Sequence, residues 1–131
     1  MRPVVTDNKV IYIRFRKDLD AIIEQAAIDA GIAKATLVGR VLTEYITALS
    51  TACRGNLASV SKADCNLSPL SSAFFAKKGR AVERSIGKPM RVTLKLVDER
   101  NMRMAAVSAG YSITQFRTAI LVSWAVRENK L

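Results

Sequence analysis

Apolar and polar positions follow the same order twice along this chain. In residues 10–49 an alternating stretch comes first, then a stretch of helical period, a glycine and a second stretch of helical period. Residues 90–126 repeat that order, and placing Gly31 on Gly110, a shift of 79 residues, brings the apolar positions of both stretches into register. Because a repeated supersecondary unit determines the architecture of a chain, this repeat is the first constraint on the fold.

The first unit is predicted to be a strand followed by two helices. Ile11, Ile13 and Phe15 alternate with polar neighbours, as expected of a half-buried strand over residues 10–16. Apolar residues then recur at helical spacing from Asp18, a candidate N-cap, to Gly31, whose left-handed conformation can end a helix. The apolar stripe of the second helix consists of Leu37, Val38, Val41, Leu42, Tyr45, Ile46 and Leu49.

The second unit opens after Pro89, which interrupts regular structure. An alternating strand is predicted over residues 90–96, and a helix from about Asp98 to Gly110. Ser112 is well placed to cap the helix that follows. Aromatic and apolar residues recur in that helix at a spacing that favours core packing over base stacking, namely Phe116, Ile120, Leu121 and Trp124.

Residues 51–88 are predicted to connect the two units rather than to form a third domain. Residues 51–69 are rich in Ser, Ala and Asn, as loops are. A short basic helix is predicted over residues 70–85, with its apolar side chains half-buried, namely Phe74, Phe75, Ala81 and Val82. Seven basic residues against two acidic ones give this connector a net charge of +5.

The charge of the chain indicates the class of its partner. The 131 residues carry a net charge of +10, with a pI of about 10.1. Residues 1–50 contribute +1 and residues 89–131 contribute +4. A domain this basic is expected to bind a polyanion, most often nucleic acid and sometimes an acidic membrane face, although charge also serves solubility alone. The length and the hydrophobic content of 50% suit one compact domain or two halves that share a core.

Several classes of protein are disfavoured. No stretch approaches the roughly 18 consecutive apolar residues of a membrane span, and the N-terminus carries no signal segment, so a cytoplasmic protein without a membrane partner is expected. Two cysteines and no histidine disfavour a metal site, and a reducing cytosol disfavours a disulfide. Without histidine, a nucleophile motif or a glycine-rich phosphate loop, neither an enzyme nor a cofactor is expected.

Two strand–helix–glycine–helix units with polar, basic outer strand faces resemble the ribbon-helix-helix (Arc/MetJ-like) family of DNA-binding proteins. The resemblance implies a mainly α fold with a short two-stranded antiparallel β-ribbon, in which the units form a tandem pseudo-dimer sharing one core. It divides the chain into a first motif over residues 1–50, the basic connector over 51–88 and a second motif over 89–131. Tandem copies in one chain are similar to plasmid conjugation accessory proteins of the TraY type.

The resemblance also implies roles for the outward-facing strand residues. Tyr12 and Arg14 in the first strand, and Arg91 and Thr93 in the second, are expected to contact bases in the major groove. An ordinary solvated strand face would carry similar residues, and this stays the alternative. Two further groups complete the expected interface: Arg16 and Lys95 for bases or backbone, and Lys34, Ser112 and Ile113 at helix N-termini for phosphates.

Sequence-specific binding of double-stranded DNA, as a transcriptional regulator and more specifically a repressor, is therefore the expected function. The alternative is a relaxosome or partition accessory protein that binds an origin region and assists a relaxase or another DNA-processing protein. An antitoxin is disfavoured because only about five residues follow Val126. The resemblance further implies copies of the chain on adjacent DNA sites and a prokaryotic protein associated with the nucleoid or a plasmid.

Overall fold

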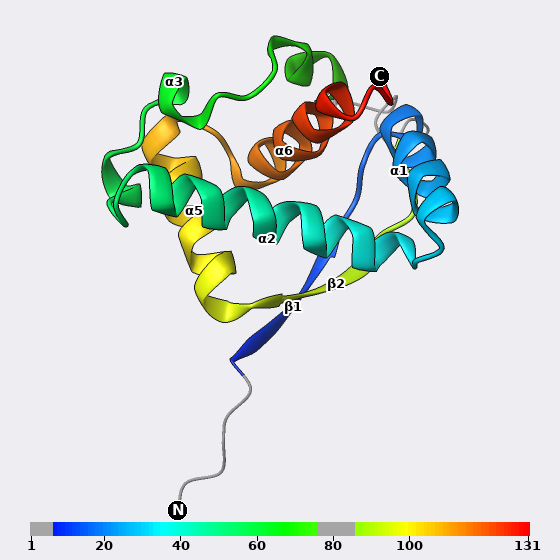
Figure 1. Ribbon diagram of the computed structural model, residues 1–131, viewed down its shortest axis with the longest axis horizontal. Helices are drawn as coiled ribbons and strands as arrows, with labels where there is room; N and C mark the ends of the chain where they lie inside the picture. Colours follow the sequence, from blue (N-terminus) through cyan, green and yellow to red (C-terminus); the bar gives the residue numbers. More distant parts are fainter. Residues whose placement is uncertain (1–6, 76–85) are drawn as a thin grey trace, which may run out of the picture.

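The computed structural model describes residues 7–75 and 86–131 and is mainly helical, with a single two-stranded sheet in that part of the chain (Figure 1). The elements are, in order, β1 (Asn8–Ile13), α1 (Lys17–Ala30), α2 (Lys34–Ala52), η1 (Leu57–Ser59), α3 (Lys62–Cys65), η2 (Pro69–Phe74), β2 (Met90–Lys95), α5 (Leu96–Ala109) and α6 (Ile113–Arg127). The coarse fold class expected from the sequence, mainly α with a short antiparallel ribbon, is confirmed.

β1 and β2 pair antiparallel, and Tyr12 lies directly opposite Arg91, next to the last pair of the ribbon. The alternating pattern of β2 is confirmed, because every second residue from Met90 onward is buried. The first strand was predicted over residues 10–16, but β1 begins two residues earlier and ends at Ile13. Phe15 is nevertheless buried as the alternation predicts, because the chain stays extended for two residues beyond the paired segment.

The two glycines that end the first helix of each unit behave as predicted. Gly31 and Gly110 follow α1 and α5 in the left-handed conformation, with φ of 68° and 83°. Asp18 was predicted to cap α1, but the helix already begins at Lys17, without a side-chain cap. Asp18 lies inside the first turn and pairs with Arg16, so its carboxylate serves the helix N-terminus by charge.

The helices bury their apolar faces in one cluster that draws residues from both units of the repeat. α2 and α6 pack against each other above the ribbon, and α1 and α5 lie at opposite ends of α2 (Figure 1). The cluster includes the inward strand residues and the predicted stripes of α2 and α6. Phe116 is fully buried at its centre, and Tyr45 packs edge-on against that ring at 5.8 Å between centroids. These aromatic rings are core residues, as the spacing predicted.

The connector wraps over the helices as short turns. η1 packs on α5, and η2 packs on α6 with Ser71 buried. Over residues 69–74 the predicted basic helix is a 3₁₀-helix with Phe74 half-buried, and the remainder of that prediction, from residue 76 on, lies outside the described residues. None of the helices in residues 7–75 and 86–131 combines the length and apolarity needed to cross a membrane.

Candidate nucleic-acid interface

The outer face of the ribbon is polar and exposed. Three cross-strand pairs lie on it, Asn8 with Lys95, Val10 with Thr93 and Tyr12 with Arg91. Tyr12 is the most exposed large hydrophobic side chain of the ribbon, at 70%. Because residues on one face of an antiparallel pair lie side by side, the structure brings the predicted contacts Tyr12, Arg91 and Thr93 together on one surface.

Arg14 and Arg16 lie beyond the paired segment and differ in their surroundings. Arg14 is exposed, and its Nε donates to the Gly87 carbonyl at 3.4 Å. Arg16 is half-buried and committed to contacts within the chain. Its guanidinium donates to the Ala73 carbonyl at 2.5 Å and to the Asp18 carboxylate at 3.0 Å. These two contacts hold the Arg16 guanidinium against η2 and the first turn of α1, and its expected contact with DNA stays a prediction.

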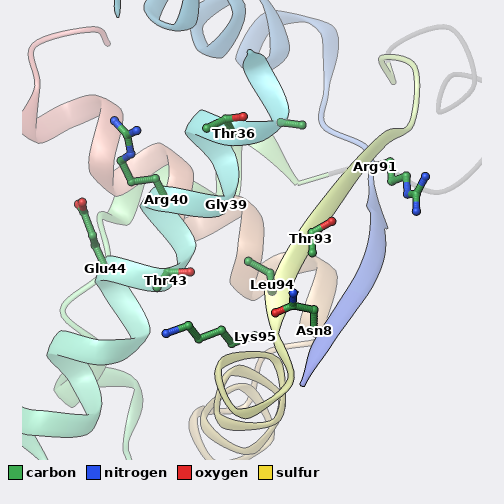
Figure 2. A pocket seen from close by; sticks show the side chains of 11 residues that line it. Asn8, Thr36, Gly39, Arg40, Thr43, Glu44, Arg91, Thr93, Leu94 and Lys95 are labelled. Carbon is green, nitrogen blue, oxygen red and sulfur yellow. The ribbon is translucent and has the colours of Figure 1, made fainter. Parts of the chain in front are cut away.

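An open groove runs along one flank of the ribbon, between α2 and β2 (Figure 2). Its volume is about 650 Å³, and it is lined by Thr36, Arg40 and Thr43 of α2 and by the β2 side chains Thr93 and Lys95. In Figure 2 Lys95 extends from the end of β2 toward α2, while Arg40 points away from the strand. The groove carries the cations Arg40, Arg91 and Lys95 against the single carboxylate of Glu44 among its lining residues, and this net positive charge favours an anionic ligand.

The close approach of α2 to β2 depends on Gly39, which lies in the middle of this groove. A Cβ at that position would stand 3.4 Å from Val92 Cγ1 and 3.7 Å from the Thr93 carbonyl oxygen. A side chain larger than a methyl group would therefore separate the helix from the strand. The sequence analysis missed this role, because a glycine inside a helical pattern signals only reduced helix stability.

The other flank of the ribbon is narrower and partly covered. A cavity of about 230 Å³ lies between Arg14, Ile86 and the first turns of α6, including Thr114 and Thr118. η2 covers one side of it with the Phe74 ring, whose centroid lies 5.9 Å from the Arg16 guanidinium carbon, and Arg16 donates a hydrogen bond to the Ala73 carbonyl of the same turn. The two flanks therefore offer different shapes to a ligand on the ribbon.

The residues predicted to bind phosphates lie at the starts of α2 and α6. Lys34 is paired within the chain, because its ammonium donates to both Asp20 carboxylate oxygens at 3.1 Å. Ser112 forms a capping box with Gln115: Ser112 Oγ accepts from the Gln115 amide at 3.1 Å. The predicted cap is thus confirmed. Ile113 is half-buried at the first position of α6, as part of the edge of the core.

Behind the ribbon, one buried carboxylate forms ion pairs with three basic side chains. Glu99 of α5 is only 1% exposed and pairs with Arg103, with Lys9 at 3.5 Å and with Arg117 at 3.5 Å. Burial alone would raise the pKa of Glu99, but the hydrogen bond and charge of Arg103, followed by those of Lys9, hold that pKa below its ordinary value. The Glu99 carboxylate is therefore ionised in the folded protein at neutral pH.

The buried guanidinium of Arg117 has the Glu99 carboxylate as its counter-charge among the described residues. Its side chain is buried in α6, and its Nε and Nη2 atoms make no hydrogen bond with any described residue. Burial and the nearby Arg103 charge lower the pKa of Arg117, while Glu99 opposes that effect. The sequence analysis missed the cluster. Only the spacing of four between Glu99 and Arg103 was visible, and it does not reveal Lys9, 90 residues away.

Comparisons with models of protein families, with curated proteins and with solved structures found no match. The ribbon and its surroundings are therefore the observations from which a function can be inferred.

Proposed function

We propose that the chain is a tandem ribbon-helix-helix pseudo-dimer that binds double-stranded DNA with its β-ribbon in the major groove and regulates transcription. One observation carries the proposal: the exposed, polar and basic face of the ribbon, which includes the pair Tyr12 and Arg91. These two residues stand 79 positions apart, which is the shift that aligns the two units in the sequence. The strand register thus supports a twofold relation between the units, with its axis between Tyr12 and Arg91.

The side chains on this face suit recognition of base edges. The major groove admits a two-stranded ribbon, and each base pair presents there a distinct pattern of donors and acceptors. Arg91 can donate two hydrogen bonds to the acceptors of a guanine, and Thr93 can hydrogen-bond or contact a thymine methyl group. Arg14, equivalent to Thr93 in the repeat, stands at the other end of the ribbon. Its long bond to Gly87 leaves the rest of the guanidinium for DNA.

The proposed DNA site is asymmetric. Tyr12 and Arg14 of the first strand correspond to Arg91 and Thr93 of the second, so the two halves of the ribbon present different donors. The flanks differ as well, because the groove beside β2 is open and the cavity beside Arg14 is partly covered. A single copy is therefore expected to prefer a non-palindromic sequence.

Phosphate contacts are proposed beside the ribbon. The first turns of α2 and α6 flank it, since Thr36 lines the groove beside β2 and Thr114 lines the cavity beside Arg14. Free amide groups at these turns favour an anion. Lys34 would have to leave Asp20 to reach a phosphate, so Ser112 and the amide of Ile113 carry more of the proposed contact. Lys77, Lys78 and Arg80, which lie outside the described residues, are proposed to add to the salt dependence of binding.

The test is selection of bound duplexes from a random DNA pool, beside the double variant Arg14→Ala/Arg91→Ala. Each lost base contact is expected to cost about 1–3 kcal/mol of binding free energy, so the variant loses the motif that the native chain selects. A matched control, Arg54→Ala/Arg127→Ala, removes the same charge from two exposed positions away from the ribbon and keeps the motif. Binding without any motif, equal in all three proteins, would overturn ribbon recognition.

Regulation is tested once the motif is known. A promoter in which the selected sequence overlaps the binding site of RNA polymerase is placed before a reporter gene. We expect repression by the native chain and none by Arg14→Ala/Arg91→Ala. The selected sequence could instead be bound tightly without any effect on the reporter and could raise DNA nicking or transfer in the corresponding assay. That result would contradict a regulator and would support an accessory protein of DNA processing.

A further inference from the structure

The cavity on the partly covered flank of the ribbon combines positive charge, hydroxyl groups and an apolar wall. It has a volume of about 230 Å³, and its described lining residues include Arg14, Arg16 and no carboxylate. The other lining residues are two threonines of α6 and two half-buried apolar side chains, namely Thr114, Thr118, Phe74 and Ile86. Polar groups that converge beside apolar side chains in a concave space are features of a small-molecule site.

The polar groups of this cavity are specific to one flank of the ribbon. The positions 79 residues away from its two arginines and two threonines line the open groove beside β2. Those positions are occupied by Thr93, Lys95, Ala35 and Gly39. Phe74 belongs to the connector, which occurs once in the chain. The repeat alone therefore does not account for the set of side chains in this cavity.

The hydroxyl group of Thr118 lacks a partner. Thr118 is only 5% exposed, and its side chain lines the cavity. Buried hydroxyl groups are as a rule hydrogen-bonded, and a threonine in a helix commonly donates to the carbonyl four residues earlier. Thr118 Oγ1 makes no such bond and bonds to no other residue in the described part of the chain. A polar atom of a ligand in the cavity would satisfy this hydroxyl group.

Arg14 supplies the charge with which an anion would pair. Its Nε donates to the Gly87 carbonyl at 3.4 Å, and its two terminal nitrogens bond to none of the described residues. A guanidinium can donate two parallel hydrogen bonds to one carboxylate. An antiparallel bridge between Arg16 and Ile86 holds the backbone at the rim of the cavity. The Gly87 amide reinforces this bridge, because it donates to the Phe15 carbonyl at 2.7 Å.

We infer that this cavity binds a small carboxylic acid with a flat apolar body. The carboxylate accepts hydrogen bonds from Arg14 and Thr118, and the apolar body lies against Phe74 and Ile86. The cavity is smaller than the roughly 300–1,000 Å³ of sites for drug-sized ligands, so the acid is limited to about one ring. A phosphate of DNA also offers an oxyanion to Arg14, but it has no apolar part to lie against Phe74.

Binding of the acid is expected to oppose binding of DNA. Arg14 is a proposed base contact, and one guanidinium cannot hold a carboxylate in the cavity and a base edge in the major groove at the same time. A bound acid therefore withdraws Arg14 from the proposed interface. This consequence rests on the proposed function, whereas binding of the acid to the cavity does not.

Benzoate is the probe for the acid, because it joins one carboxylate to one ring. Its titration into the native chain is followed by NMR at the amide groups of Ile86 and Thr118. We expect saturable shifts with a dissociation constant of about 0.1–1 mM, which is within reach of so few ligand atoms. Acetate lacks the ring and benzyl alcohol lacks the charge, so each is expected to bind at least about tenfold more weakly.

Two variants test where benzoate binds. Thr118→Val removes the hydroxyl group and keeps the shape of the side chain, and Phe74→Ala removes the apolar wall. Each is expected to weaken benzoate binding at least about fivefold, after circular dichroism has shown native helix content. Thr43→Val, the matched control in the open groove, should bind benzoate as the native chain does.

Two results of these titrations would overturn the inference. One is equal affinity for benzoate in the native chain, Thr118→Val and Phe74→Ala. The other is a response to acetate and to inorganic phosphate as strong as the response to benzoate, which would indicate an adventitious ion only.

A DNA experiment separates this inference from the proposed function. The selected duplex is titrated with the native chain in sodium benzoate and in sodium acetate at equal ionic strength, because salt alone weakens DNA binding. We expect at least about fivefold weaker binding in benzoate for the native chain, and equal affinity in the two salts for Thr118→Val. Benzoate that binds without changing the affinity for DNA would overturn the coupling. Benzoate binding by a chain that selects no DNA motif would leave the acid site standing and would remove the proposed function.

Discussion

The two flanks of the ribbon are built from equivalent parts of the repeat and differ in shape. On one flank, α2 approaches β2 across Gly39 and leaves an open groove of about 650 Å³. On the other, the residue 79 positions after Gly39 is Thr118, which is buried, and η2 covers the space beside it. The exchange of glycine for threonine, together with the cover supplied by η2, thus accompanies the difference between an open flank and a partly covered one.

The carboxylates at equivalent positions of the repeat differ in the same way. Asp20 of α1 is half-buried and pairs with the single cation Lys34. Glu99 of α5, 79 residues later, is almost fully buried and holds Lys9, Arg103 and Arg117. Glu99 therefore belongs to a buried ionic network, whereas Asp20 forms one half-buried ion pair. Substitution of Glu99 and substitution of Asp20 should change the stability of the chain by unequal amounts.

The largest expected effect is loss of stability on Glu99→Ala. Removing the carboxylate leaves buried Arg117 without its counter-charge, which should cost about 3–5 kcal/mol of unfolding free energy. Asp20→Ala, the matched change in the first unit, should cost about 1 kcal/mol or less, because Lys34 can then turn to water. Urea unfolding followed by circular dichroism measures both. Equal losses would contradict the contrast between the two carboxylates.

The same carboxylate sets a pH dependence. The pKa of Glu99 is lower in the folded chain than the ordinary 4.5, so its contribution to stability is present above pH 4.5 and is lost as pH falls below that value. Glu99→Gln removes the titrating group and should flatten this part of the stability curve. Urea midpoints collected between neutral and acid pH test it, and an unchanged slope in Glu99→Gln would assign the acid sensitivity to other groups.

Removing the cover from the partly covered flank should have a smaller effect on stability. Arg16→Ala removes the hydrogen bond to the Ala73 carbonyl and the contact with the Phe74 ring, at a cost of about 1–1.5 kcal/mol. We expect faster amide hydrogen exchange at Phe75, whose amide donates to Ser72 in the same turn. Lys17→Ala serves as the control at a neighbouring exposed position. Unchanged exchange at Phe75 would show that η2 is held by its packing on α6 alone.

Filling the open flank by one methyl group should change least. Gly39→Ala places a Cβ at 3.4 Å from Val92 Cγ1, an ordinary contact, and improves helix propensity. The expected gain is about 0.5–1 kcal/mol of unfolding free energy. The reverse change on the other flank, Thr118→Gly, should lower stability because it empties a buried site and weakens α6. A loss of stability in Gly39→Ala would show that α2 cannot yield to the added methyl group.

Local signals predicted much of the fold. The αL glycines that end α1 and α5, the Ser112 cap and the alternation of β2 each depend on a few adjacent residues, and the structure confirms them. The Asp18 cap was wrong for a reason that is also local. An acidic residue is favoured both before a helix and within its first turn, so its presence does not fix where the helix begins.

Features that depend on distant parts of the chain were not visible in the sequence. The exposure of Tyr12, Arg91 and Thr93 followed from alternation, but the partner of Arg16 lies 57 residues away and that of Lys34 lies 14 away. The groove depends on how close α2 approaches β2, which no single segment encodes. The DNA experiments distinguish an interface from an ordinary solvated surface at the outer face of the ribbon.

The pairing of Tyr12 with Arg91 has a consequence for how binding preferences can change over evolutionary time. In a ribbon made of two identical chains, any mutation at the position on the twofold axis appears on both strands at once, and an arginine there would face its own copy. Here Tyr12 and Arg91 are encoded separately and differ. A single nucleotide change can therefore alter one side of the ribbon while the other stays as it was, so the preferences of the proposed DNA interface can change by single steps.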